Sequence, residues 1–487
     1  MYIFIEKAIS LLLLLLVLCV LNINGREFRI AWMAATKTYH GLNASSSVGA
    51  LKLALQAISV GDILVNHTVR VKWYDSGCNQ KTALAAAVSA KSNFDPDLFL
   101  GPPCSSAMRE VAQLASNWRR PIFGWVSNDI EFSNKTKYST LIRLLGPLNK
   151  LPSVMRFVSK LFKWKIFSMI HDEAAPYAAV AAAIAEDKDA TIKSTHEVNV
   201  RMEDNEIESI FQQVRKNSRI LIFSVPIHTL RMYMIVAHRL GMSSGDFAFL
   251  CIHGDLYTWN ELSTEVLSDE VWRKNDKDDQ GARQAFESVL HIIMPTFESA
   301  KLSEQFNHLV NKMTNLENNN WINLPPVSEP DAYAPYLYDA TLTWAIMADK
   351  ILKENEDPSD GDIMKKRTVN FYHEGLTHLI KLDPDGDRFL HFSMFDMQEN
   401  GRFQRIIEIK YEMSGVVVNT TESDYKLVRW ANGKYGLHNA PPDVPACGFE
   451  KDHCPEGNNS VQKYQIFILS KILPANFCLP HQSSKQN

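Results

Sequence analysis

The sequence predicts an α/β protein with two doubly wound parallel sheets in a bilobed, clamshell architecture. Strand-like and helix-like segments alternate along the chain, which is typical of βαβ units with largely parallel strands. The alternation runs to about residue 126 and begins again near residue 165. A chain of 487 residues is also too long for one compact core, so two domains are expected.

Apolar periodicity defines the first set of elements. Residues 68–74 alternate and place Val71 and Trp73 on one face, as in a strand. Residues 105–117 carry Met108 and Val111 at helical spacing. In this half we predict strands at 28–33, 68–74, 97–100 and 121–126, and helices at 48–60, 81–92 and 105–117.

The pattern then repeats. We predict strands at 165–170, 219–223 and 247–252, and helices at 174–185, 207–216 and 229–240. A long helix follows at 336–352, and Pro335 suits the first helical position. Its predicted buried stripe consists of Leu337, Trp344, Ala348 and Ile351. Residues 376–382 and 389–395 are strand-like and flank a Pro-Asp-Gly sequence, which predicts a hairpin.

Charge and targeting signals narrow the class of protein. A net charge of -4 argues against a nucleic-acid-binding protein. Lys7 precedes an apolar run over 8–21, which predicts a signal peptide at 1–25; the alternative is an uncleaved signal anchor. The best later apolar segment, 464–473, is shorter than the roughly 20 residues that span a bilayer. We therefore expect a secreted, extracellular product.

The cysteines fit an oxidising compartment. Six follow the signal peptide and allow 15 pairings. Strand-like runs precede Cys78 and Cys104 and would bring both to one sheet edge, so we predict that they pair. Cys447 and Cys454 are close together in a Pro-rich stretch and are predicted to pair, within the chain or between chains. Cys251 is predicted to be a buried thiol in a core strand.

The sequence also predicts a glycosylated surface. Sequons of the form N-x-[ST] lie in polar stretches that have the composition of loops. Their asparagines are Asn43, Asn66, Asn134, Asn419 and Asn458.

Several segments resemble the ectodomain of the natriuretic-peptide receptors, which include receptor guanylyl cyclases, within the type I periplasmic-binding-protein-like superfamily. The most specific segment is Pro441-Pro-Asp-Val-Pro-Ala-Cys-Gly-Phe449. The others are residues 99–104, 282–286, 338–340, 370–377, 386–388 and 395–403. The resemblance implies two lobes joined by a three-crossover hinge within a ligand-binding region at 27–440. The implied parts are lobe 1 at 27–146 and 297–376, lobe 2 at 147–296 and 377–440, a juxtamembrane-like segment at 441–456 and a divergent tail at 457–487.

The resemblance implies a function outside the cell. Members of the family bind a peptide hormone between two ectodomains, so a homodimer, or a heterodimer with a full-length receptor, is expected. We expect no membrane helix and no kinase-like or cyclase region here, hence no enzymatic activity and either a soluble decoy or a truncated receptor. The alternative function is a clamshell that binds an amino acid or another small molecule.

The candidate ligand site is the predicted turn between a strand and a helix at 101–106. Backbone N–H groups at a helix N-terminus bind anions, so the candidates are Gly101, Cys104, Ser105 and Ser106. In the family this turn also binds chloride through the glycine and cysteine backbone. Pro103 has no N–H, which argues against chloride here, and no other cofactor is expected. The alternative role of Ser105 is simply to cap the helix.

Three motifs do not support catalysis or metal binding. Gly241-Met-Ser243-Ser-Gly245 follows a predicted helix and precedes a strand, whereas a nucleophile elbow needs the reverse order, so Gly241 is interpreted as a helix cap. The acidic residues at 383–387 lack the later glutamate of a calcium loop. His373 and His378 do not have the spacing of a zinc pair. We therefore predict no catalytic residue and no metal site.

Overall fold

The computed structural model describes most of the chain between residues 25 and 450. The described residues are 25–37, 42–186, 189–253, 266–267, 271–294, 297, 300–314, 324, 330–389, 391–412, 414–418, 421 and 425–450. Residues 1–24 of the predicted signal peptide and the predicted tail at 457–487 lie outside them.

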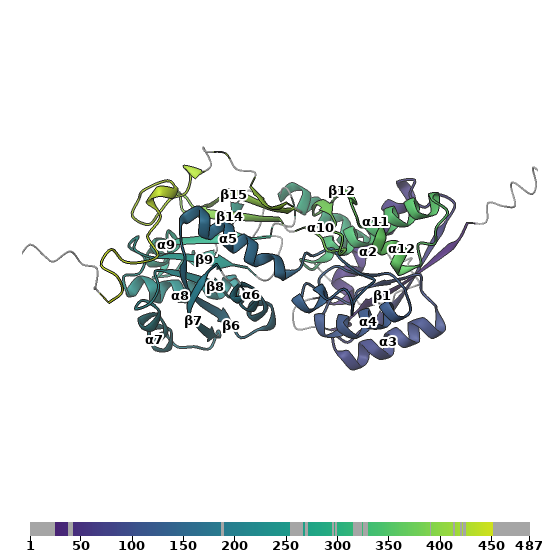
Figure 1. Ribbon diagram of the computed structural model, residues 1–487, viewed down its shortest axis with the longest axis horizontal. Helices are drawn as coiled ribbons and strands as arrows, with labels where there is room; N and C mark the ends of the chain where they lie inside the picture. Colours follow the sequence, from purple (N-terminus) through teal and green to yellow (C-terminus); the bar gives the residue numbers. More distant parts are fainter. Residues whose placement is uncertain are drawn as a thin grey trace, which may run out of the picture. The chain divides into compact units, whose positions relative to one another are not determined.

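A five-stranded parallel sheet contains the first set of strands (Figure 1). Its order is β2 (Thr68–Asp75), β1 (Glu27–Ala34), β3 (Leu98–Leu100), β4 (Ile122–Gly124) and β5 (Leu141–Arg143). The helices of this part are α2 (Ala44–Val60), α3 (Gln80–Asn93), α4 (Ser105–Asn117), α10 (Ala300–Thr314), α11 (Ala334–Lys353) and α12 (Gly361–Lys366).

The strand β1 is apolar at nearly every position because both of its faces are buried. Ile30 and Trp32 belong to the core cluster that includes residues of α2 and α11. Ala31 and Met33 point to the other face, where α3 and α4 pack. Figure 1 shows α2, α11 and α12 on one side of β1, and α3 and α4 on the other. The predicted stripe of α11 is confirmed: Leu337, Trp344, Ala348 and Ile351 are fully buried.

A nine-stranded sheet contains the second set. In order its strands are β10 (Val266–Leu267), β15 (Phe403–Glu412), β14 (His391–Met397), β11 (Val289–Ile293), β9 (Ala248–Ile252), β8 (Ile220–Ser224), β6 (Ile166–Asp172) and β7 (Thr191–Val198), and β16 (Gly415–Val418) pairs with β15. Neighbouring strands among β7, β6, β8, β9 and β11 run parallel. The pairs that involve β14, β15, β10 and β16 are antiparallel. The helices of this part are α5 (Leu151–Phe162), α6 (Ala175–Ala185), α7 (Asp204–Val214), α8 (Ile227–Arg239) and α9 (Asp279–Phe286). The two largely parallel sheets confirm the predicted α/β class.

The chain passes three times between the elements of the two sheets. It leaves β5 for α5 and β6, leaves β11 for α10, and runs from β13 (His378–Lys381) to β14. The helix α10 packs against α2, beside the five-stranded sheet. Single-turn 3-10 helices lie at Ile130–Ser133, Leu148–Lys150 and Leu437–Asn439. The lobe boundaries given above remain a prediction.

The predicted hairpin of 376–382 with 389–395 is wrong. The strand β13 pairs with β12 (Tyr372–Gly375), whereas β14 pairs with β11 and β15 in the nine-stranded sheet. The Pro-Asp-Gly turn does form: the Gly386 N–H donates to the Asp383 carbonyl, and Leu382 forms a bridge with Arg388. The strand-like residues on either side of the turn separate after one bridge. The residues before the turn pair with β12, and those after it pair with β11 and β15.

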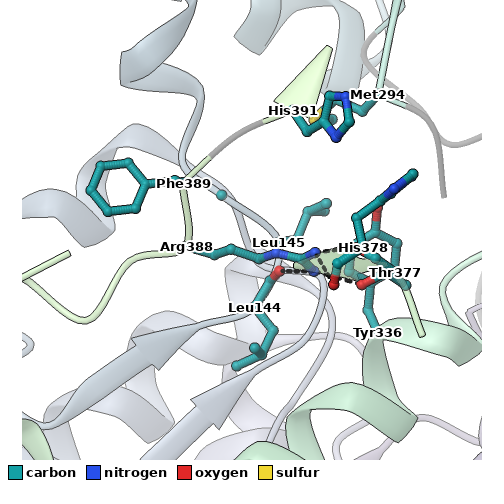
Figure 2. A pocket seen from close by; sticks show the side chains of 10 residues that line it. Leu144, Leu145, Met294, Tyr336, Thr377, His378, Arg388, Phe389 and His391 are labelled. Atoms are coloured by element: carbon teal, nitrogen blue, oxygen red, sulfur yellow. Dashed lines mark hydrogen bonds between the residues drawn. The ribbon is translucent and has the colours of Figure 1, made fainter. Parts of the chain in front are cut away.

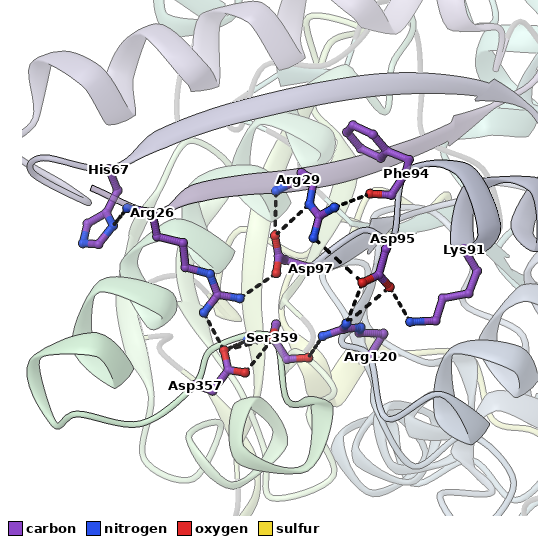
Figure 3. Close-up of polar contacts among 10 residues, drawn as sticks. All are labelled: Arg26, Arg29, His67, Lys91, Phe94, Asp95, Asp97, Arg120, Asp357 and Ser359. Atoms are coloured by element: carbon purple, nitrogen blue, oxygen red, sulfur yellow. Dashed lines mark hydrogen bonds and ion pairs between the residues drawn. The ribbon is translucent and has the colours of Figure 1, made fainter. Parts of the chain in front are cut away.

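A polar network fixes the start of β1 (Figure 3). Asp97, whose side chain is almost fully buried, accepts hydrogen bonds from the Arg29 backbone at 2.8 Å and from the Arg26 guanidinium at 2.6 Å. Arg26 also binds Asp357 at 2.7 Å. The network thereby joins β1 to the segment before β3 and to the turn after α11.

The segment before residue 443 is attached to the first residues of β6. The Trp164 indole N–H donates to the Pro441 carbonyl at 2.7 Å. The Asp443 carboxylate accepts from the backbone N–H groups of Lys165 and Ile166 at 2.6 and 3.0 Å. Trp430 is also buried, and its ring forms a T-shaped pair with the ring of Trp164. The most family-specific segment of the sequence therefore begins beside the N-terminal end of the core strand β6.

Candidate functional site

The predicted ligand turn lies between β3 and α4, and the bounds of α4 match the predicted helix. Gly101 is buried with φ +82°, and its N–H donates to the Phe123 carbonyl at 2.8 Å. The Gly101 N–H already has an acceptor, and Pro102 and Pro103 have no backbone N–H to donate. The turn therefore offers few hydrogen-bond donors to chloride. The Ser127 hydroxyl donates to both proline carbonyls, at 3.1 and 2.9 Å, and holds the turn in place.

Three of the four candidates lie at the start of α4. Cys104 is the N-cap residue, and its side chain makes no capping hydrogen bond because it forms a disulfide with Cys78. Ser105 is half-buried at the first helical position, so it does not act as the N-cap. Ser106 is exposed, and its hydroxyl donates to the Cys78 carbonyl at 3.2 Å. The disulfide and this bond fix the turn to the loop after β2.

The other predicted sites differ in what the structure describes. Cys447 is disulfide-bonded, and its predicted partner Cys454 lies outside the described residues. Among the sequon asparagines, Asn66 and Asn134 are exposed, whereas Asn43 caps α2 through its side chain. Asn419 and Asn458 lie outside the described residues.

Cys251 and Gly241 have the predicted structural roles. Cys251 is buried in β9, as predicted. Gly241 follows the end of α8 with φ +72°, as a helix cap does.

The sequence reasoning missed a buried charge network where the chain crosses between the sheets. We call it the crossing network; it consists of Lys135, Arg143, Asp339, Thr377, Asp387 and Arg388. The fully buried Arg143 binds Asp387 through two hydrogen bonds, at 2.7 and 2.6 Å. Lys135 binds the same carboxylate at 2.7 Å. Burial alone would raise the pKa of Asp387, but Arg143 and Lys135 outweigh it and lower that pKa.

The second half of the crossing network is centred on Thr377. Arg388 donates to the Thr377 hydroxyl at 2.6 Å and also to its carbonyl. Asp339 of α11 accepts from the backbone N–H groups of Leu376 and Thr377 at 2.7 and 2.8 Å. Burial raises the pKa of Asp339 despite the charge of Arg388. The network therefore joins α11, the β12–β13 turn and the segment leading to β14.

A small pocket lies beside the crossing network (Figure 2). Figure 2 shows Arg388 reaching toward Thr377 and the Leu144 carbonyl. Burial, with smaller effects from the charges of His391 and Arg388, lowers the pKa of His378 to about 3. The pocket is lined by Leu144, Leu145, Gly146, Met294, Tyr336, Thr377, His378, Arg388, Phe389 and His391. These residues include members of all three crossings.

Of the described aromatic residues, Tyr336 and Phe389 line this pocket, whereas Trp125 and Tyr177 do not. Trp125 is fully buried beneath Gly101, and Tyr177 is buried in the second sheet region. Tyr257 and Trp259 lie outside the described residues. Trp125 therefore supports the turn at Gly101 and offers no surface to a ligand.

The receptor family ligand-binding region matches residues 47–400. This match covers well over half of the sequence and includes strands of both sheets. The chain belongs to this family. The natriuretic-peptide-receptor resemblance of the sequence is thus confirmed at the level of the ligand-binding region. Within the described residues, none of the helices combines the length and apolar character that a membrane crossing requires.

The curated relatives of this chain include receptors and a cyclase. Atrial natriuretic peptide receptor 3 of Mus musculus is 26% identical over 377 residues, which are 70% of this chain and 66% of the receptor. Guanylate cyclase 2G of Rattus norvegicus is 23% identical, over 85% of this chain and 36% of the cyclase. Atrial natriuretic peptide receptor 2 of Mus musculus is 27% identical, over 78% of this chain and 36% of that receptor. The chain thus spans less than two thirds of these relatives' lengths.

Proposed function

We propose that this chain is an extracellular peptide-hormone-binding region of a natriuretic-peptide-receptor-like protein. The observation that carries the proposal is the family match over residues 47–400, together with relatives that are named as natriuretic peptide receptors. The chain acts by binding and not by catalysis, in a homodimer or in a heterodimer with a longer receptor. Free in solution, it lowers the concentration of unbound hormone by mass action.

The crossing network gives this proposal a physical basis. Three chain segments pass between the two sheets, and a hinge absorbs rotation in a few such residues. The pocket residues come from each crossing, so a change in hinge angle alters their spacing. In our proposal the bound peptide favours one hinge angle, and Arg388 with Thr377 holds the third crossing in register.

We assign the turn at 101–106 a part in contacting the peptide. Ser106 is exposed at the N-terminus of α4, where backbone dipoles favour a carboxylate or another anionic group. The disulfide between Cys78 and Cys104 keeps the N-terminus of α4 rigid. Less conformational entropy is therefore lost when a peptide binds there.

Calorimetric titration of the glycosylated, secreted chain tests the proposal. Atrial natriuretic peptide and a set of secreted peptides from the source organism are the probes, and saturable binding of one peptide class is expected. The variant Ser106→Trp should weaken this binding at least tenfold. The matched control is Ser89→Trp, which places the same bulk on an exposed position of α3.

Two outcomes contradict the proposal. One is the absence of binding by every peptide while the protein remains folded by circular dichroism. The other is micromolar binding of a free amino acid, which would favour the small-molecule clamshell instead. Sedimentation with and without peptide then tests the dimer, and mass spectrometry of the secreted protein tests glycosylation at Asn66 and Asn134.

A further inference from the structure

Three metal-ligating side chains meet in the core of the nine-stranded sheet, away from the ligand turn and the crossing network. Cys251, His253 and His291 each offer one ligand atom, and these atoms lie within 4.8 Å of one another. All three residues are buried, with at most 2% of their surface exposed. Thiolate and imidazole are the ligands that zinc prefers in proteins.

Strand register explains why these three side chains meet. Cys251 in β9 and His291 in β11 are direct partners on neighbouring parallel strands, so their side chains share a face. His253 follows Cys251 by two residues and extends the same face beyond the strand. The backbone therefore positions all three ligands.

The spacing of the cluster is slightly wider than the spacing around a metal ion. His253 lies between the other two residues: its Nδ1 is 3.9 Å from the Cys251 sulfur and its Nε2 is 3.0 Å from Nδ1 of His291. Only one of its nitrogens can bind a given ion, and one ligand atom from each residue lies within 4.8 Å of the other two. Ligand atoms on tetrahedral zinc are about 3.3 to 3.7 Å apart, given Zn–S near 2.3 Å and Zn–N near 2.0 Å. Side-chain rotations of about 1 Å at the ligand atoms would therefore suffice.

One nitrogen at the site has no described partner. Nε2 of His291 is buried and accepts or donates no hydrogen bond among the described residues. The ring packs against Phe403 at 4.8 Å and Phe286 at 6.1 Å, so aromatic carbon surrounds it. A buried polar nitrogen without a partner is costly, and a metal ion bound to this nitrogen would offset that cost.

We propose that Cys251, His253 and His291 form a structural site for a thiophilic metal ion of the zinc type. Binding replaces the thiol proton of Cys251, which is released, by a sulfur–metal bond; the two imidazoles bind through nitrogen lone pairs. The ion ties the end of β9 to the middle of β11. Because all three ligands are buried, it enters during folding and exchanges slowly afterwards.

Metal analysis of the full chain tests this site. The protein is secreted from cells in zinc-supplemented medium, purified without a histidine tag and dialysed against a chelator. We expect about one zinc per chain that is retained in the native protein and released on unfolding. The variants Cys251→Ala and His291→Phe should lose nearly all of it, whereas His238→Gln, which lies outside the cluster, should retain it.

Cobalt provides a second test that does not depend on variants. Wild-type protein refolded with Co²⁺ should show thiolate-to-cobalt absorption, and zinc should abolish it. Wild-type protein that takes up neither ion during folding overturns the proposal, as does Cys251→Ala that is folded and binds as much zinc as wild type. Binding of Cu⁺ in preference to both ions would overturn the zinc assignment. None of these measurements depends on the hormone.

Discussion

The buried pair of Arg143 and Asp387 shows what a single residue contributes here. Two hydrogen bonds at 2.7 and 2.6 Å join a guanidinium that is fully inaccessible to a carboxylate that is nearly so. Removing one partner from such a pair leaves a buried charge without compensation. Sequence reasoning recognised Gly386-Asp387-Arg388 only as a family-like segment, because Arg143 lies 244 residues away and no local pattern connects them.

The variant Asp387→Asn should destabilise the fold by about 3–5 kcal/mol, because Arg143 and Lys135 lose their counter-charge. Urea unfolding of wild type and variant measures the difference. The control is Asp204→Asn, which breaks an exposed pair with Arg239 and should cost under about 1 kcal/mol. Equal effects in the two variants would contradict the importance that we give to burial.

At the scale of elements, the turn from β3 to α4 depends on a residue without a side chain. A Cβ on Gly101 would lie 2.2 Å from the Trp125 ring and 2.6 Å from the Met33 carbonyl. The periodicity of 105–117 predicted α4 correctly because its apolar stripe faces one core. The hairpin at 376–395 was mispredicted because strand propensity does not specify the partner, which here lies in another sheet.

Two glycine variants separate backbone strain from steric clash. Gly101→Ala and Gly241→Ala both place a Cβ at positive φ, +82° and +72°. The space around Gly241 is empty to 4 Å, so only strain of about 1 kcal/mol is expected there. Gly101→Ala should cost at least about 2 kcal/mol more because Trp125 must move. Thermal unfolding of both variants measures this, and equal melting temperatures would show that the clash is relieved.

The disulfide that fixes this turn also has a measurable effect. Cys78 and Cys104 are 26 residues apart. Closing a loop of that length lowers the entropy of the unfolded chain and so raises the free energy of unfolding by about 3–4 kcal/mol. The double variant Cys78→Ala with Cys104→Ala should lose that much stability in urea unfolding. Reduced wild-type protein serves as the comparison; if it unfolds at the same urea concentration as oxidised protein, the bond contributes nothing.

For the whole molecule, the three crossings concentrate titratable groups in one place. Class, sheet content and family followed from the sequence, since they depend on periodicity and on local segments such as Pro441–Phe449. The crossing network and the Cys251, His253 and His291 cluster did not, because each is assembled by strand register and long-range contacts. His253 and His291 stand 38 positions apart and match no metal-binding spacing.

Acidification should therefore weaken the fold through His378. Its folded pKa of about 3 lies below the ordinary value near 6.5, so the neutral form is favoured in the folded state. The associated stability is fully present above about pH 6.5 and declines as the pH falls toward 3. The variant His378→Gln should show a flatter decline between pH 6.5 and 4.

Denaturant midpoints at several pH values measure this difference. The control variant His238→Gln, from a helix outside the pocket, should keep the wild-type slope. Identical pH slopes for wild type and His378→Gln would mean that the histidine does not take up its proton on unfolding.

The bonds from Asp443 to the backbone of Lys165 and Ile166 make that point of the chain an attachment site. The Trp164 indole secures Pro441 two residues earlier. Any displacement of the N-terminal end of β6 therefore moves Asp443 as well. A pulling force applied to the chain beyond Asp443 would act on these hydrogen bonds before it reached the rest of the sheet.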